Sequence, residues 1–180
     1  MKATGIVRRI DDLGRVVIPK EIRRTMRIRD GDPLEIYTEK DGEVIFKKYS
    51  PMGELAEFAS QICESLHKST GSMTVVCDRD SVIAVAGLPR RELIDKRISH
   101  ELEQLMESRR LYRAEIGMMS LPLTEADERY SISVQAPILS EGDVLGCIAF
   151  IALPNSGPAG ELETKLAQTV ATFLGRQLEG

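Results

Sequence analysis

Basic side chains concentrate in the first 29 residues of this 180-residue chain. Most of them are arginines, whose planar guanidinium group donates two parallel hydrogen bonds to a phosphate or to the edge of a guanine base. Seven residues form the candidate set: Arg8, Arg9, Arg15, Lys20, Arg23, Arg24 and Arg27. This set predicts a binding site for a polyanion.

The distribution of charge supports this interpretation. The formal net charge of the chain is −4, but residues 1–50 hold 12 basic and 9 acidic side chains, a net of +3. Residues 51–180 hold 12 basic and 19 acidic side chains, a net of −7. In residues 1–29 alone the excess reaches +6, from nine basic and three acidic residues. A basic segment on an acidic protein indicates a polyanionic partner for that segment alone.

A short helix is expected to position the second half of the candidate set. Pro19 suits the first turn of a helix, and about two helical turns follow it. At about 100° per residue, the wheel gives this helix a cationic arc and an opposite apolar side. The arc holds Lys20, Arg23, Arg24 and Arg27, and the apolar side holds Ile18, Ile22 and Met26.

The simplest alternative is a charged helix face that meets only solvent. A solvated helix usually interleaves acids with its basic residues at i±4, and Glu21 is the only acid between Pro19 and Ile28. The pattern therefore favours nucleic-acid binding. Arg8 and Arg9 lie in a predicted strand, where neighbours point to opposite faces, so the two need not act alike.

Two domains are expected, at residues 1–50 and 51–180, with the linker YSPMG at 49–53. The first domain predicts the order β-β-α-β-β, with strands at 4–10 and 14–19 and a hairpin around Asp41-Gly42. A domain of about 40–60 residues often needs oligomerisation to complete its core.

The second domain predicts the order α-β-β-α-β-β-α. Strands are expected at 72–78 and 81–87, a helical region at 92–108, and a hairpin turn at 140–143. Helices at 54–66 and 161–178 carry apolar stripes, which pack either on their own sheet alone or also against a second subunit as a helical bundle. The stripes are Leu55, Phe58, Ala59, Ile62 and Leu66, and Leu162, Leu166, Val170, Phe173 and Leu174.

The segments GIVR, LGRVVIP and EIRR occur in order within residues 5–24. With them the first 50 residues resemble the DNA-binding domain of the AbrB family of bacterial transition-state regulators. The resemblance implies a swapped-hairpin barrel in which two chains interleave, hence a homodimer through residues 1–50 that binds double-stranded DNA. It implies DNA contacts from Arg8, Arg15, Arg23 and Arg24, with a basic residue at the position of Arg9. At Arg27, relatives often carry a helix-ending glycine instead.

The element order of residues 51–180 resembles a GAF domain, a small-molecule sensing module with a central antiparallel sheet. The overall fold class is therefore α+β. The resemblance implies a ligand pocket between the sheet and the helical region, for an unidentified small molecule. The Asn-Lys-Phe-Asp-Glu signature of cyclic-nucleotide GAF domains is absent, and no cofactor is expected. For the whole chain, the resemblance implies a tetrameric regulator of late gene expression in a developing spore.

Other function classes fit less well. His67 and His100 are isolated, and no GxSxG, HExxH or Walker sequence is present, so an enzyme is not expected. The three cysteines match no zinc or disulfide spacing. No apolar run approaches the ~18 residues of a membrane span, so we expect a cytoplasmic location. An antitoxin remains the alternative, because antitoxins share this DNA-binding fold, but their C-terminal tails are short and poorly ordered.

Overall fold

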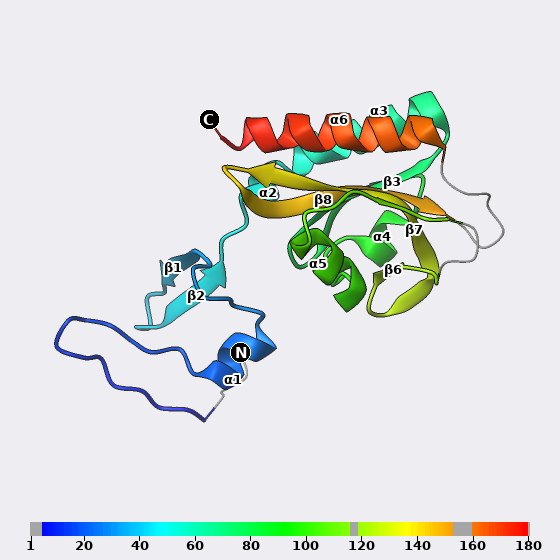
Figure 1. Ribbon diagram of the computed structural model, residues 1–180. Coiled ribbons are helices and arrows are strands. Elements are labelled where there is room, and N and C mark those ends of the chain that lie inside the picture. The colour runs from blue at the N-terminus through cyan, green and yellow to red at the C-terminus, as the bar shows by residue number, and fades with distance from the viewer. Residues whose placement is uncertain (1–4, 116–118, 153–159, 180) are drawn as a thin grey trace. The chain divides into compact units, whose positions relative to one another are not determined.

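A computed structural model of the chain describes residues 5–115, 119–152 and 160–179 (Figure 1). The chain divides into two compact units, residues 1–49 and residues 50–180. Both contain helices and strands, in agreement with the predicted α+β class. Among the described helices, none has the length and the apolar character needed to cross a membrane.

The first unit consists of a short helix and a hairpin. Helix α1 (Lys20–Thr25) is followed by strands β1 (Leu34–Thr38) and β2 (Val44–Lys48). The strands pair antiparallel, with Thr38 opposite Val44. Gly42 adopts a φ of 80°, which a glycine tolerates without strain, at the turn between them. The predicted hairpin around Asp41-Gly42 is confirmed.

Two other expectations for the first unit are wrong for the single chain. Residues 5–18 form no strand, because the described sheet of the first unit consists of β1 and β2, which pair with each other and do not include these residues. The helix also ends earlier than the wheel assumed. It stops at Thr25, and Arg27 has a left-handed φ of 52°, so Arg27 lies beyond the helix and outside its cationic arc.

The second unit is built on an antiparallel sheet with the strand order β4-β3-β8-β7-β5, and β6 pairs with β7. Its strands β3, β4 and β8 are rich in Val and Ile, β-branched residues that favour strands, and a hydrophobic core lies on each face. The predicted strand pair and the turn at 140–143 are confirmed. The strands are β3 (Met73–Asp78), β4 (Val82–Ala86), β5 (Tyr112–Arg113), β6 (Pro122–Thr124), β7 (Asp127–Ser140) and β8 (Asp143–Ala152).

Helices cover both faces of this sheet (Figure 1). On one face, α2 (Pro51–Glu54), α3 (Ala56–Thr70) and α6 (Glu161–Gln177) enclose a core that includes Met52, Ile138 and Phe150. On the other, α4 (Arg90–Leu93) and α5 (His100–Glu107) enclose a second core. The predicted helical region at 92–108 is thus two short helices. Ser99 starts the second by accepting a hydrogen bond from the Leu102 N–H.

The predicted stripe of α6 is only partly the buried one. The residues that face the sheet are small, with Leu174 as the exception: Ala167, Ala171, Leu174 and Gly175. Leu166 and Val170 pack at the edge of the core, whereas Leu162 and Phe173 remain 59% and 45% exposed. Small residues occupy the positions that face the sheet because α6 lies very close to it. A Cβ atom at Gly175 would lie 2.0 Å from the carbonyl oxygen of Leu139 on β7.

Candidate nucleic-acid interface

A closed turn at residues 11–15 presents the candidate residue Arg15. The Asp11 N–H donates to the Arg15 carbonyl at 3.1 Å, and the Gly14 N–H donates to the Asp11 carbonyl at 3.0 Å. The Asp11 Oδ1 accepts hydrogen bonds from the backbone N–H groups of Leu13 and Arg15, at 3.0 and 2.8 Å. Gly14 has a φ of 76°, which completes the turn. These bonds fix the backbone from which the Arg15 side chain leaves.

The Arg15 side chain is exposed and has one acidic neighbour. Its Nε donates to Asp11 Oδ2 at 2.8 Å, although 69% of the side chain is accessible. The Arg15 backbone N–H, followed by its guanidinium, lowers the pKa of the Asp11 carboxyl below its usual value. Sequence reasoning treated the arginine alone and missed this acid, although an aspartate four residues before an arginine in a glycine turn was a usable signal.

Helix α1 presents two exposed basic residues and a half-buried one. Lys20 and Arg24 are exposed, and within the described part of the chain no acid pairs with either side chain. Arg23 is half-buried, and its Nη1 donates to Asp30 Oδ1 at 2.5 Å. Asp30, which follows the helix, is a second acid that sequence reasoning did not connect with the arginines. Because Asp30 is 95% exposed, this ion pair contributes little to stability.

The remaining candidates lie apart from this helix face. Arg8 and Arg9 are exposed, and Arg8 also lines an apolar groove. Arg27 is half-buried, and its carbonyl accepts a hydrogen bond from Lys48 Nζ at 2.9 Å. The structure thus brings Lys20, Arg23 and Arg24 together on one helix. It places the other four candidates on separate segments of the first unit.

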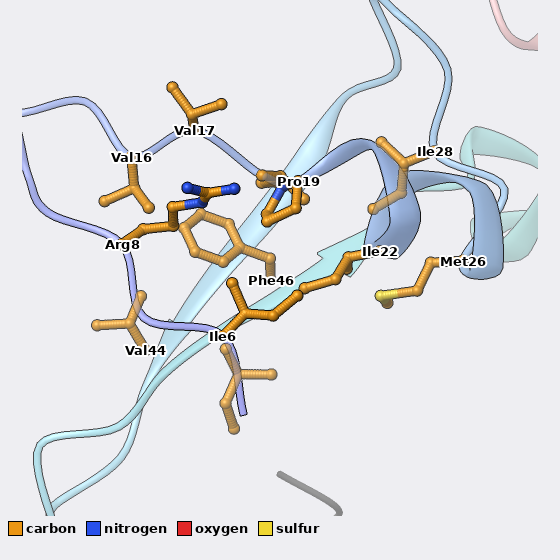
Figure 2. Close-up of a pocket in the computed structure, with 12 residues that line it drawn as sticks. Ile6, Arg8, Val16, Val17, Pro19, Ile22, Met26, Ile28, Val44 and Phe46 are labelled. Carbon is orange, nitrogen blue, oxygen red and sulfur yellow. The ribbon is translucent and has the colours of Figure 1, made fainter. Parts of the chain in front are cut away.

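An apolar groove lies between α1, strand β2 and the extended residues before α1, and the sequence predicted only its helix side. It has a volume of about 550 Å³, and Figure 2 shows Ile22, Phe46 and Val44 around it. The predicted apolar side of the helix lies here, since Ile18, Ile22 and Met26 all line the groove. Pro19 is the only buried residue among those described in the first unit. Large apolar side chains remain in solvent, among them Val7 at 88% and Val17 at 71% exposure.

The second unit holds a separate candidate, the amide of Gln135. This side chain is fully buried on β7, and neither its Oε1 nor its Nε2 has a hydrogen-bond partner among the described residues. Its neighbours Val134 and Ala136 belong to the core under α3 and α6. By strand alternation Gln135 therefore faces α4 and α5. A buried polar group without a partner costs about 1–3 kcal/mol, so this position requires an explanation.

Metal and thiol sites are not apparent in the described chain. No group of three His, Cys, Asp or Glu side chains among the described residues could hold a metal ion. Cys63, Cys77 and Cys147 are buried and free. Burial raises the pKa of the Cys63 thiol to about 12, which disfavours the nucleophilic thiolate.

Comparison with known proteins assigns a family to each unit. Residues 54–179 match the family model described as stage V sporulation protein T C-terminal, transcription factor. Residues 7–53 match the model described as antidote-toxin recognition MazE, bacterial antitoxin. The first match spans most of the chain and names a transcription factor, which implies a role other than catalysis.

Individual relatives agree with these matches. The chain is 48% identical to stage V sporulation protein T of Bacillus subtilis (strain 168) over 180 residues, 99% of each chain. It is 61% identical to the transition state regulatory protein AbrB of the same organism over 51 residues, 28% of this chain and 52% of AbrB. The predicted AbrB resemblance of the first unit is thereby confirmed.

The second unit has the fold of a GAF domain. It superposes on the GAF domain of a phosphoenolpyruvate-protein phosphotransferase from Coxiella burnetii with a TM-score of 0.54. The identity is 18%, and the match covers 69% of this chain and 82% of the other, so the likeness concerns the fold alone. With an AbrB-like unit, a GAF-like unit and a full-length relative in agreement, the chain belongs to the stage V sporulation protein T family of transcription factors.

Proposed function

We propose that this transcription factor binds double-stranded DNA through the basic surface of a dimer of its first unit. The observation that carries the proposal is the set of exposed basic side chains on a unit whose apolar residues are also exposed. The contact residues proposed are those of the sequence analysis: Arg8, Arg9, Arg15, Lys20, Arg23, Arg24 and Arg27. Arginine serves phosphate and guanine alike, and the helix carries no Asn or Gln for adenine, so the preference for a site rests on shape as well as on base edges.

The dimer is inferred from the open groove and from a β-branched segment that belongs to no sheet. Residues 16–18 form no strand in the described chain, and Val16, Val17 and Phe46 line a groove that remains open. A second copy that inserts the same segments supplies both the backbone partners and the apolar cover. Each Val, Ile or Phe side chain that becomes fully buried contributes about 1.5–3 kcal/mol. This is the swapped-hairpin barrel that the AbrB resemblance implies.

The DNA-binding proposal is tested with single alanine variants of the full-length protein. Arg24→Ala removes an exposed basic side chain of α1, and Lys40→Ala removes a charge of the same sign from the hairpin turn. Fluorescence anisotropy on a labelled duplex measures both affinities. We expect Arg24→Ala to bind at least about tenfold more weakly, because symmetry removes two contacts per dimer. Equal affinities of the two variants would contradict the proposed surface.

The biological role proposed is the control of late gene expression during sporulation. It rests on the name of the Bacillus subtilis relative, which matches this chain along its full length. The site of action is then the cytoplasm of the developing spore. Expression of this chain in a Bacillus subtilis strain that lacks the relative tests the role. Restored expression of the affected sporulation genes supports it, and no restoration by a stably produced protein contradicts it.

The outer faces of α3 and α6 are proposed to join two such dimers into a tetramer. The rings of Phe58 and Phe173 meet at 5.9 Å, and Leu162 and Phe173 are largely exposed on α6. Leu162→Glu should therefore convert tetramers into dimers, measured by light scattering, while the circular dichroism spectrum stays unchanged. Gln104→Glu is the matched control, since it adds the same charge at an exposed position of α5, on the other side of the sheet. Tetrameric Leu162→Glu would contradict the interface.

A small-molecule site is proposed between the sheet and α4–α5, with Gln135 as its polar anchor. The amide offers a donor and an acceptor side by side, which complements a ligand with an adjacent carbonyl and N–H, such as an amide or a nucleobase. Thermal unfolding in the presence of a panel of such compounds tests this. A compound that stabilises the wild type and fails to stabilise Gln135→Leu supports the site. Equal stabilisation of both proteins contradicts it.

The antitoxin alternative receives less support. The MazE-type model matches only residues 7–53, and residues 54–179 match a transcription-factor model and form a folded GAF-like unit. An antitoxin tail is expected to be cleaved rapidly by proteases. A protease-resistant fragment of about 130 residues favours the sensor domain instead.

A further inference from the structure

Asp11 stands out because it is an acid within the surface proposed to bind a polyanion. Its carboxylate accepts three hydrogen bonds, from the backbone of Leu13 and from the backbone and the Nε of Arg15. Its own backbone N–H closes the turn by donating to the Arg15 carbonyl. The neighbouring Asp12 is also exposed, but within the described part of the chain its carboxylate accepts no hydrogen bond. Two adjacent acids thus have different surroundings.

The Arg15 guanidinium has one N–H group that binds Asp11 and four that remain for another partner. Asp11 Oδ2 engages Nε, and the two Nη groups carry the other four N–H donors. An exposed ion pair usually contributes little, since it must hold two mobile side chains in place. Here the Asp11 carboxylate is already held by two backbone N–H groups of the same turn. Forming the ion pair therefore restricts mainly the side chain of Arg15, because that of Asp11 is already fixed.

Simple electrostatics gives the opposite expectation for this residue. An ionised carboxylate next to a DNA phosphate is repelled, so its removal is expected to strengthen binding. Any benefit of Asp11 to DNA binding must therefore come from its hydrogen bonds to the Arg15 backbone N–H and guanidinium, and not from its charge.

We propose that Asp11 is a positioning residue that holds the Arg15 side chain in the orientation in which its Nη groups meet DNA. The inference rests on the proposed DNA-binding role of Arg15. Preorganisation of one flexible side chain changes an affinity roughly 2- to 12-fold for each arginine ordered. The dimer holds two such arginines, so the effect on one duplex is the product of both.

The test compares Asp11→Asn with Asp12→Asn in the full-length protein. Both variants remove one negative charge from the same turn. Asparagine at position 11 retains an oxygen for the backbone bonds, but its NH₂ group cannot accept a hydrogen bond from the Arg15 Nε. We expect Asp12→Asn to bind a duplex as tightly as the wild type or more tightly. We expect Asp11→Asn to bind at least about fourfold more weakly than Asp12→Asn, the product of about twofold for each of two arginines.

A double-mutant cycle assigns the effect to Arg15. In an Arg15→Ala background, Asp11→Asn and Asp12→Asn should have the same affinity, because there is no guanidinium left to position. If Asp11→Asn binds as tightly as Asp12→Asn, the inference is overturned. It is also overturned if the loss persists undiminished without Arg15. If Arg15→Ala itself has no effect, the proposed DNA-binding role of Arg15 fails instead, which is a distinguishable result.

A spectroscopic measurement on the wild-type protein provides a test without any variant. The hydrogen bond to Asp11 should slow exchange of the Arg15 Nε–H with water, relative to that of Arg24, for which no acid partner lies in the described chain. Nitrogen-edited NMR at low temperature resolves such side-chain signals. Slower exchange at Arg15 supports the inference, and equal exchange at both residues overturns it.

Discussion

Val17 is the most informative position for testing the dimer of the first unit. In the single chain its side chain lines the groove and is 71% exposed (Figure 2). A substitution at so exposed a position normally changes stability by less than about 0.5 kcal/mol. If a second copy covers the groove, however, Val17→Asp loses the burial of a valine and places a carboxylate in an apolar interface.

The expected magnitude follows from these two terms. Full burial of an exposed valine contributes about 1.5–3 kcal/mol, and since 71% of Val17 is still exposed, its burial in the dimer contributes about 1–2 kcal/mol in each of two copies. The loss is therefore at least about 2 kcal/mol, or about a thirtyfold rise in the dissociation constant, before the cost of the buried carboxylate is added. Sedimentation analysis should show that the full-length variant has lost one association step, and anisotropy should show that it has lost DNA binding.

Lys40→Glu provides the control for this experiment. It changes the charge by two units at the exposed hairpin turn, whereas Val17→Asp changes it by one, yet it removes no apolar surface. The reasoning predicts the wild-type assembly for Lys40→Glu and a smaller particle for Val17→Asp. A Val17→Asp protein with the wild-type mass at micromolar concentration would refute the swapped interface.

Three further predictions concern separate parts of the chain. Arg23→Ala and Arg24→Ala should have different effects on DNA binding, because adjacent helical residues point about 100° apart and cannot make the same contact. One variant should bind a cognate and a scrambled duplex more weakly by the same factor, whereas the other should lose about 1–3 kcal/mol of the preference for the cognate duplex. Gly175→Ala should lower the melting temperature, since its Cβ would meet a backbone oxygen at 2.0 Å, whereas Gly53→Ala meets nothing closer than 3.7 Å and should be tolerated. The free energy of unfolding should fall as the pH rises from about 9 towards 12. The pKa of the Cys63 thiol is raised to about 12 in the folded protein, so this thiol loses its proton at a lower pH in the unfolded chain than in the folded one. A Cys63→Ala variant should show a smaller decline in the free energy of unfolding.

The sheet of the second unit was largely predictable from sequence. Residues 75–77 and 82–86 are short apolar runs on either side of a polar turn, and the turn at 140–143 contains Gly142, which tolerates a positive φ. These signals are local, because each hairpin pairs segments that are neighbours in sequence. The expected stripe on α6 was less accurate, since periodicity alone could not show that Ala167 and Ala171, and not the larger Leu162, face the sheet.

The first unit shows where sequence patterns and a single chain differ. The β-branched run at Val16–Ile18 has strand character but forms no strand, because its backbone partners are absent from the described residues of one chain. The candidate arginines were identified from charge and spacing. Their pairing with Asp11 and Asp30 was not, because it depends on turns that bring acids back towards the basic surface.

The salt dependence of DNA binding by the full-length protein tests the central claim most directly. Arg15, Arg23 and Arg24 occur twice in a dimer, and if together they neutralise about six phosphates, log K should fall against log salt with a slope of roughly −5. The measurement is an anisotropy titration of one duplex at several salt concentrations. A slope near −5 that flattens by roughly 2 when a phosphate-contacting arginine is replaced by alanine agrees with a basic dimeric surface. A slope close to zero, or one unchanged by every arginine substitution, contradicts it.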